Sequence, residues 1–116
     1  MAGKLEVKTF KAAMVADIFG YMNDELSELL VNEFRKFLQN GTKIFCFNFA
    51  RVEIVNSVAL SRLLDIISEG ISDESLEFYF CSIPNECRFG FTGINLFAYV
   101  TELKDLSEFE NRLKNR

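Results

Sequence analysis

The sequence predicts a single α/β domain over residues 1–116, with elements in the order ββαβαβαβα. Two observations lead to this fold class. Short apolar runs of strand length alternate with segments whose apolar residues recur at helical spacing. Strands separated by helices must cross over and run parallel, whereas two strands joined by a short corner pair antiparallel. We therefore expect a mostly parallel five-stranded sheet with an antiparallel first hairpin and about four helices.

The first hairpin and helix occupy residues 5–39. Apolar and charged residues alternate over residues 5–10, and residues 12–19 form a nearly continuous apolar run after a corner at Lys11. We expect Gly20 to end this second strand. Asn23 or Asp24 then caps a helix that ends at Asn40-Gly41. Its apolar stripe comprises Leu26, Leu29, Leu30, Phe34, Phe37 and Leu38.

The second half repeats the alternation of strand and helix. Residues 43–49 are bulky and β-prone and predict a buried strand, which a loop joins to a helix from Ser57 to Ser68. Leu60, Leu63, Leu64 and Ile67 supply the apolar side of that helix. The remaining expected elements are strands at residues 76–81 and 97–101, a short helix that begins at Pro84, and a last helix that begins at Asp105.

Composition excludes several classes of function. A net charge of −4 and a pI near 4.9 argue against a nucleic-acid groove, which needs clustered Lys and Arg. No apolar run approaches the roughly 20 residues that span a bilayer, and a signal-peptide pattern is lacking, so we expect a cytoplasmic protein without membrane insertion.

Catalysis is not expected either, and no cofactor or metal is predicted. The chain has three cysteines in no zinc-binding pattern and no histidine, so we expect reduced, partly buried thiols. The acidic pairs Asp73-Glu74 and Glu108-Glu110 are explained more simply as solvated charge than as catalytic carboxylates.

The most informative position is Ser57, a hydroxyl residue at the start of an amphipathic helix. Free backbone N–H groups and the helix dipole favour negative charge there, so a phosphoryl group would be tolerated. The alternative is that Asn56 or Ser57 is an ordinary N-cap, which contributes about 1 kcal/mol to the helix.

Several segments together resemble the STAS domain of bacterial anti-sigma factor antagonists, from Leu5 to about Leu113. In that family an Asp-Ser-Ser-Gly-Leu turn starts the second helix, and Asn56-Ser57-Val58-Ala59-Leu60 occupies the same place here. Phe47-Asn48-Phe49 corresponds to the stretch that ends the preceding strand. Gly20 resembles a glycine that ends the second strand, and Pro84 to Gly93 resembles a Ser-Pro-Glu…Thr-Gly stretch.

The resemblance implies a regulated binding protein. Members of the family bind an anti-sigma factor that is also a serine kinase, phosphorylation of the first serine of the turn ends binding, and a PP2C-type phosphatase restores it. Ser57 matches that serine. The family's Asp, second Ser and Gly are replaced by Asn56, Val58 and Ala59, which weakens the match to the phosphorylation motif. A non-phosphorylated STAS scaffold of a signalling or lipid-transport complex is therefore the alternative.

Helix geometry predicts which surface meets a partner. Ser57, Ser61, Asp65 and Ser68 lie on one stripe opposite the leucines. The preceding loop and the end of the second strand are expected to lie beside it. An ordinary solvated helix face is the alternative, with Tyr21 and Met22 covering the core. The predicted partner-binding residues are Tyr21, Met22, Asn23, Arg51, Glu53, Asn56, Ser57, Val58, Ser61, Arg62 and Asp65.

Overall fold

The computed structural model describes residues 3–116 and contains one five-stranded sheet in the order β1-β2-β3-β4-β5. β1 and β2 pair antiparallel, and the other neighbours pair parallel, which confirms the predicted fold class. The elements are β1 (Lys4–Phe10), β2 (Ala13–Met22), α1 (Asp24–Gln39), β3 (Ile44–Val55), α2 (Ser57–Ser72), β4 (Glu77–Cys81), α3 (Asn85–Gly93), the 3-10 turn η1 (Leu96–Ala98), β5 (Thr101–Leu103) and α4 (Leu106–Lys114).

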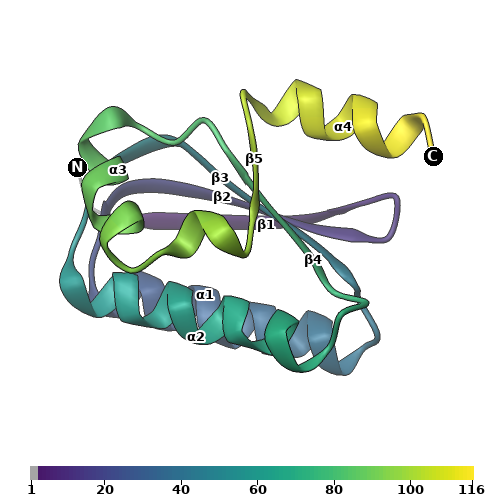
Figure 1. Ribbon diagram of the computed structural model, residues 1–116, viewed down its shortest axis with the longest axis horizontal. Helices are drawn as coiled ribbons and strands as arrows, with labels where there is room; N and C mark the ends of the chain where they lie inside the picture. Colours follow the sequence, from purple (N-terminus) through teal and green to yellow (C-terminus); the bar gives the residue numbers. More distant parts are fainter. Residues whose placement is uncertain (1–2) are drawn as a thin grey trace.

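The helices form two unequal layers around the sheet. α1 and α2 lie side by side on one face, α4 covers the other, and α3 lies at the end of the sheet where α2 begins (Figure 1). The larger core lies under α1 and α2 and is built around phenylalanine rings, including Phe34, Phe45 and Phe78. The smaller core lies under α4 and includes Tyr79 and Phe109.

Two strands are longer than the sequence predicted. β2 does not end at Gly20 but continues to Met22, because Gly20 adopts a φ of +81° at a register shift against β3. Few other residues tolerate that backbone conformation, so glycine permits an irregularity inside the strand instead of ending it. β3 continues to Val55, and Arg51 and Glu53 therefore lie on a strand paired with β2 and not on a loop.

Other boundaries also differ from the predictions. The expected strand at residues 97–101 is wrong: η1 occupies Leu96–Ala98, and β5 begins only at Thr101. α2 extends to Ser72 and is longer than expected. Leu29 is 53% exposed and therefore lies outside the apolar stripe assigned to α1.

Helix caps were predicted well. The Asn23 side chain accepts a hydrogen bond from the Leu26 N–H at 3.0 Å, so Asn23 and not Asp24 caps α1. At α4 the Asp105 carboxylate accepts from the Glu108 N–H at 2.9 Å, as the capping-box pattern indicated.

The three cysteines are free thiols, as expected, and all three are buried, which is more than the partial burial that was predicted. The Sγ atoms of Cys46 and Cys81 lie 3.4 Å apart under α4. The neighbouring Cys81 thiol and burial raise the pKa of Cys46, so this thiol stays protonated. Among the described residues, no helix is long and apolar enough to cross a membrane.

Candidate partner-binding site

The start of α2 is fixed by Asn56. Its side-chain oxygen accepts a hydrogen bond from the Ala59 N–H at 2.8 Å, and its own N–H donates to the Met22 carbonyl at 3.1 Å. Asn56 is therefore the N-cap, and it ties the start of α2 to the end of β2. Because Asn56 makes this cap, the Ser57 hydroxyl is not needed for it.

Ser57 is the first residue of α2, and its side chain is exposed. Within residues 3–116, the backbone N–H groups of Ser57 and Val58 have no hydrogen-bond partner. Both belong to the first turn of the helix, where the dipole places partial positive charge. A phosphoryl group on the Ser57 hydroxyl would find these donors beside it, so local structure is compatible with phosphorylation.

The N-terminal ends of α1 and α2 are joined by hydrogen bonds. The Asn56 amide donates to the Asp24 carboxylate at 2.9 Å. The Arg62 guanidinium donates to the Asp24 carbonyl and, at 3.2 Å, to the Ser27 hydroxyl. Ser27 is fully buried, and its hydroxyl donates to the same Asp24 carbonyl at 3.0 Å. Arg62 and Asn56 therefore hold the site together, whether or not a partner also contacts them.

The structure brings most of the predicted surface to one end of the sheet. Parallel strands β2 and β3 end there, and α2 begins there. The exposed members are Tyr21, Arg51, Glu53, Ser57, Val58, Ser61 and Asp65, while Asn23, Asn56 and Arg62 are half-buried. Met22 is the exception. Its side chain is fully buried in the larger core, so it cannot contact a partner, and the prediction that Met22 binds a partner is wrong.

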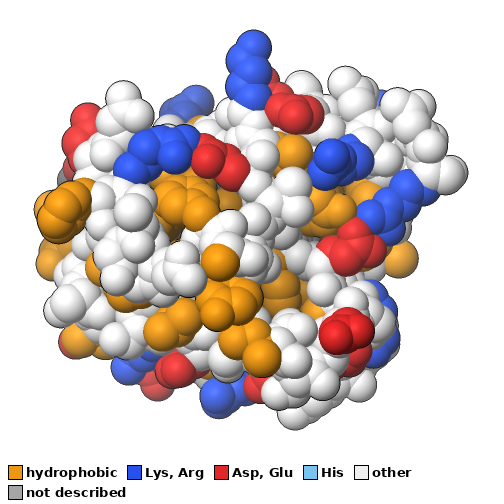
Figure 2. Space-filling view, viewed as in Figure 1, with side chains coloured by type: hydrophobic (Ala, Val, Ile, Leu, Met, Phe, Trp, Pro, Cys, Tyr) orange, Lys and Arg blue, Asp and Glu red, His pale blue; other side chains and the backbone are white. Residues whose placement is uncertain are grey.

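Two exposed apolar residues at this end were missed. Ile54 lies on β3 directly beside Tyr21 of β2. Phe89 lies on α3 and is 90% exposed. α3 packs against the start of α2 so closely that a Cβ on Gly90 would lie 2.9 Å from a Leu60 methyl carbon. Figure 2 shows hydrophobic side chains exposed at the left end of the molecule, over α3 and the start of α2.

The sequence did carry a signal for Phe89. In a helix, successive residues are rotated by about 100°, so positions two apart point to nearly opposite sides. The buried residues of α3 are Cys87 and Phe91, and Phe89 lies midway between them. Once α3 is placed, its outward direction follows. We define the switch surface as the exposed set Tyr21, Ile54, Ser57, Val58, Ser61 and Phe89.

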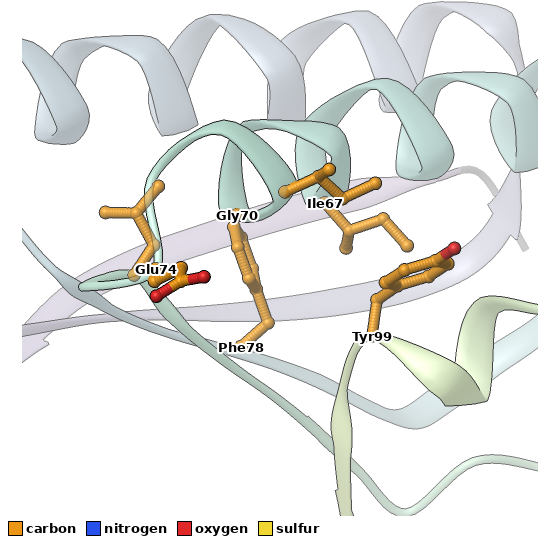
Figure 3. A pocket seen from close by; sticks show the side chains of 7 residues that line it. Ile67, Gly70, Glu74, Phe78 and Tyr99 are labelled. Atoms are coloured by element: carbon orange, nitrogen blue, oxygen red, sulfur yellow. The ribbon is translucent and has the colours of Figure 1, made fainter.

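A hollow near the C-terminal end of α2 lacks the residues of a catalytic site. It has a volume of about 250 Å³ and lies between α2, β4 and Tyr99. Figure 3 shows Ile67 and Phe78 along its apolar wall, with Glu74 and Tyr99 at its sides. One carboxylate and one phenol in an apolar hollow do not form a nucleophile with its base, so the hollow offers contact area and no catalytic arrangement.

The acidic pairs have structural partners. The Asp73 carboxylate accepts hydrogen bonds from the Ser75 hydroxyl and N–H and pairs with Lys43 at 3.3 Å. The Ser75 bonds, followed by Lys43, lower the pKa of Asp73. Glu108 accepts from the Lys104 N–H at 2.8 Å. These contacts fit the interpretation of the pairs as ordinary charged surface.

The Asn56–Asp24 contact leads to a stability prediction. Asn56→Asp restores the acid of the family motif but places two carboxylates where an amide now donates to one. We expect a loss of about 1 kcal/mol in the free energy of unfolding, since a hydrogen bond becomes a repulsion at an exposed site.

A double-mutant cycle with Asp24→Asn tests the cause. The double variant reverses donor and acceptor, and urea unfolding should show at least half of the loss recovered. If the two substitutions are simply additive, the repulsion is not the reason that Asn occupies position 56.

Comparison with solved structures identifies the class of fold as that of anti-sigma factor antagonists. One such protein from Thermotoga maritima is 20% identical, with 95% of this chain and 94% of that chain covered and a TM-score of 0.81. SpoIIAA from Bacillus, in its phosphorylated form, is 17% identical over 97% and 99% of the two chains, with a TM-score of 0.75. A serine-to-glutamate variant of RsbS from Moorella thermoacetica is 16% identical over 97% and 96%, with a TM-score of 0.79.

The STAS resemblance of the sequence is thereby confirmed at the level of the fold. No family model matches the chain, and no curated protein matches its sequence. At these identities the shared property is the backbone arrangement. The function must therefore be argued from the residues at the start of α2.

Proposed function

We propose that this chain is an anti-sigma factor antagonist-like protein that regulates transcription by binding an anti-sigma serine kinase, and that phosphorylation at Ser57 ends the binding. A PP2C-type phosphatase would reverse the modification, and the cytoplasm is the setting in which these partners meet. The observation that carries the proposal is the exposed Ser57 at the first position of α2, beside two N–H groups that have no hydrogen-bond partner among residues 3–116.

The switch surface supplies a physical reason for the loss of binding. Tyr21, Ile54 and Val58 are exposed apolar side chains close to Ser57 along the chain or across the β2–β3 pair. A partner that buries them also buries the Ser57 hydroxyl, which costs little because a hydroxyl is small and neutral. A phosphoryl group carries about two negative charges at pH 7, and burying it without a cationic partner is strongly unfavourable.

The solved relatives support this reading. SpoIIAA, an anti-sigma factor antagonist, is known in unphosphorylated and phosphorylated forms. RsbS was solved with a serine replaced by glutamate, which introduces a negative charge. RsbS therefore keeps this fold with a carboxylate in place of one serine, and SpoIIAA keeps it when phosphorylated.

We expect Phe89 to contribute to partner binding and not to stability. An exposed aromatic side chain on a well-packed helix is typical of an interface anchor. Phe89→Ala should weaken binding of the kinase at least tenfold and leave the melting temperature unchanged. Ile71→Ala is the matched control, because Ile71 is 59% exposed but lies near the far end of α2. Equal effects of the two substitutions would exclude Phe89 from the interface.

One observation favours a constitutive scaffold as the second candidate function. Asn56 and Val58 replace polar members of the phosphorylation motif, and the Asn56 amide is occupied by Asp24. A kinase that needs an acid beside the serine would then not modify this chain. In that case the same surface would bind its partner permanently, in a signalling or lipid-transport complex.

Capture from the native cell distinguishes the two functions. Ser57→Ala and Ser57→Asp proteins are used as baits, and captured proteins are identified by mass spectrometry. The proposal predicts that the Ala bait retains a serine kinase that binds a sigma factor and that the Asp bait loses it. Equal capture by both baits would favour the scaffold, and capture of no sigma-binding kinase by the Ala bait would contradict the proposal.

A further inference from the structure

The free edge of β1 has a charge pattern that matches its own antiparallel copy. β1 is the outermost strand of the sheet, and among the described residues it pairs only with β2, without a register shift. Its seven residues, Lys4–Phe10, therefore present an unpaired row of backbone groups along the other side. A strand edge of this kind can accept a further strand.

The side chains of β1 alternate between two faces. Leu5 and Val7 pack on the larger core, on the side of α1. Lys4, Glu6 and Lys8 lie on the opposite side and are exposed. Lysines on an edge strand often prevent association. Here, however, Glu6 lies between the two lysines, so the row is not of one sign. Glu6 pairs with Lys4 of its own strand at 2.7 Å, and in a dimer it would be shared between this lysine and Lys8 of the second copy.

Antiparallel pairing of two β1 strands across a twofold axis at Val7 uses the full length of both strands. Val7 then lies opposite Val7 of the second copy. Glu6 of each copy lies opposite Lys8 of the other, which gives two such pairs by symmetry. A shift that centres the pair on Glu6 instead places two glutamates opposite each other and Lys4 opposite Lys8. Of these two registers, the one centred on Val7 pairs the full length of both strands and places opposite charges across from each other.

The neighbouring helix provides an apolar contribution on the other face. Leu29 of α1 is 53% exposed, and with Leu5 and Val7 it lines a groove of about 370 Å³ between α1 and β1. Asn32, Glu33 and Lys36 form the polar side of this groove. A second copy related by the axis at Val7 brings its own Leu29 to the same place, so that the apolar groove is covered on both copies.

We propose that two copies of this chain associate through antiparallel β1 strands centred on Val7, forming one continuous sheet. The strand that binds this edge is β1 of a second copy, because it has the same length and places opposite charges across from those of the first copy. The contact lies on the outer edge of β1 and not at the start of α2. It leaves the Ser57 end of each copy open, and it stands whether or not the proposed switch is correct.

Charge exchange tests the register. Sedimentation equilibrium of the wild-type chain should show a concentration-dependent rise from 13.3 kDa towards twice that mass. Glu6→Lys and Lys8→Glu should each raise the dissociation constant at least tenfold, because each places like charges opposite each other in both pairs. An equimolar mixture of the two variants should recover the dimer, since the lysines of one then face the glutamates of the other.

Glu86→Lys, at an exposed site on α3, is the control for a change of net charge and should leave association unchanged. At a protein concentration far below the wild-type dissociation constant, both edge variants should retain the wild-type melting temperature, because the exchanged side chains are exposed. The proposal is overturned by a wild-type chain that stays monomeric at millimolar concentration. It is equally overturned by a dimer that Glu6→Lys does not weaken, or by a mixture of the two variants that stays monomeric.

Discussion

Phe80→Ala should lower the free energy of unfolding by about 3–5 kcal/mol. Phe80 lies on β4 with its side chain fully buried. Its ring centroid is 4.9 Å from that of Phe49, 5.5 Å from Phe47 and 6.0 Å from Phe91. The substitution removes a ring that three others contact, and the rigid sheet cannot close the cavity. Because domains of this size are stable by only about 5–15 kcal/mol, this is a large part of the total.

Urea unfolding followed by circular dichroism measures this loss. Phe89→Ala is the matched control, because it removes the same ring from a site that is 90% exposed. Its effect should stay within about 0.5 kcal/mol. If the two substitutions cost the same, the core does not lie where the structure places it.

Ser57→Asp should weaken binding to the anti-sigma kinase by a hundredfold or more, which corresponds to about 2.7 kcal/mol. The charge would lie in the middle of the switch surface, where binding removes water from Tyr21, Ile54 and Val58. The same substitution should not destabilise the chain, because a carboxylate in the first turn of a helix interacts favourably with its dipole.

Ser107→Asp provides the control for this effect. Ser107 is also an exposed serine in the first turn of a helix, but it lies on α4, on the opposite face of the sheet. Isothermal titration calorimetry should give wild-type affinity for this variant. A loss of affinity for both variants would point to net charge, and a loss for neither would favour the scaffold function.

Features set by local interactions could be predicted from the sequence. The caps at Asn23 and Asp105 join residues within one helical turn, and Asn and Asp are residue types that commonly cap helices. Ser57 was placed at the start of a helix for the same reason. The element order then required a mostly parallel sheet, because strands separated by helices cross over.

Features set by tertiary pairing could not be predicted. Arg51 and Glu53 suggested a loop, but β2 pairs with this segment and extends the strand to Val55. The extension of β2 past Gly20 depends on the same pairing. At residues 97–101 the apolar pattern suggested a strand, whereas Phe97 packs on Phe91 and Arg88 within a turn. The position of Met22 in the core follows from the longer β2.

The candidate site divides in the same way. Ser57, Ser61 and Asp65 could be placed on an exposed stripe from helical spacing alone. Ile54 lies only three residues before Ser57, but a loop was expected there, and only the pairing with Tyr21 places Ile54 on β3. Spacing alone assigns Phe89 to the outward side of α3, whereas the packing of Gly90 against Leu60 is what brings α3 to the start of α2. The contact between Asn56 and Asp24 joins residues 32 positions apart, and only the fold shows why an amide is suited to position 56.

The central claim is that one hydroxyl, at the first residue of α2, receives the phosphoryl group. Incubation of the chain with its anti-sigma kinase and ATP, followed by tandem mass spectrometry, tests this claim most directly. We predict a single phosphorylated residue, Ser57, and no incorporation into the Ser57→Ala variant. Phosphorylation at another residue, or none by a kinase that is active on a second substrate, would contradict the account.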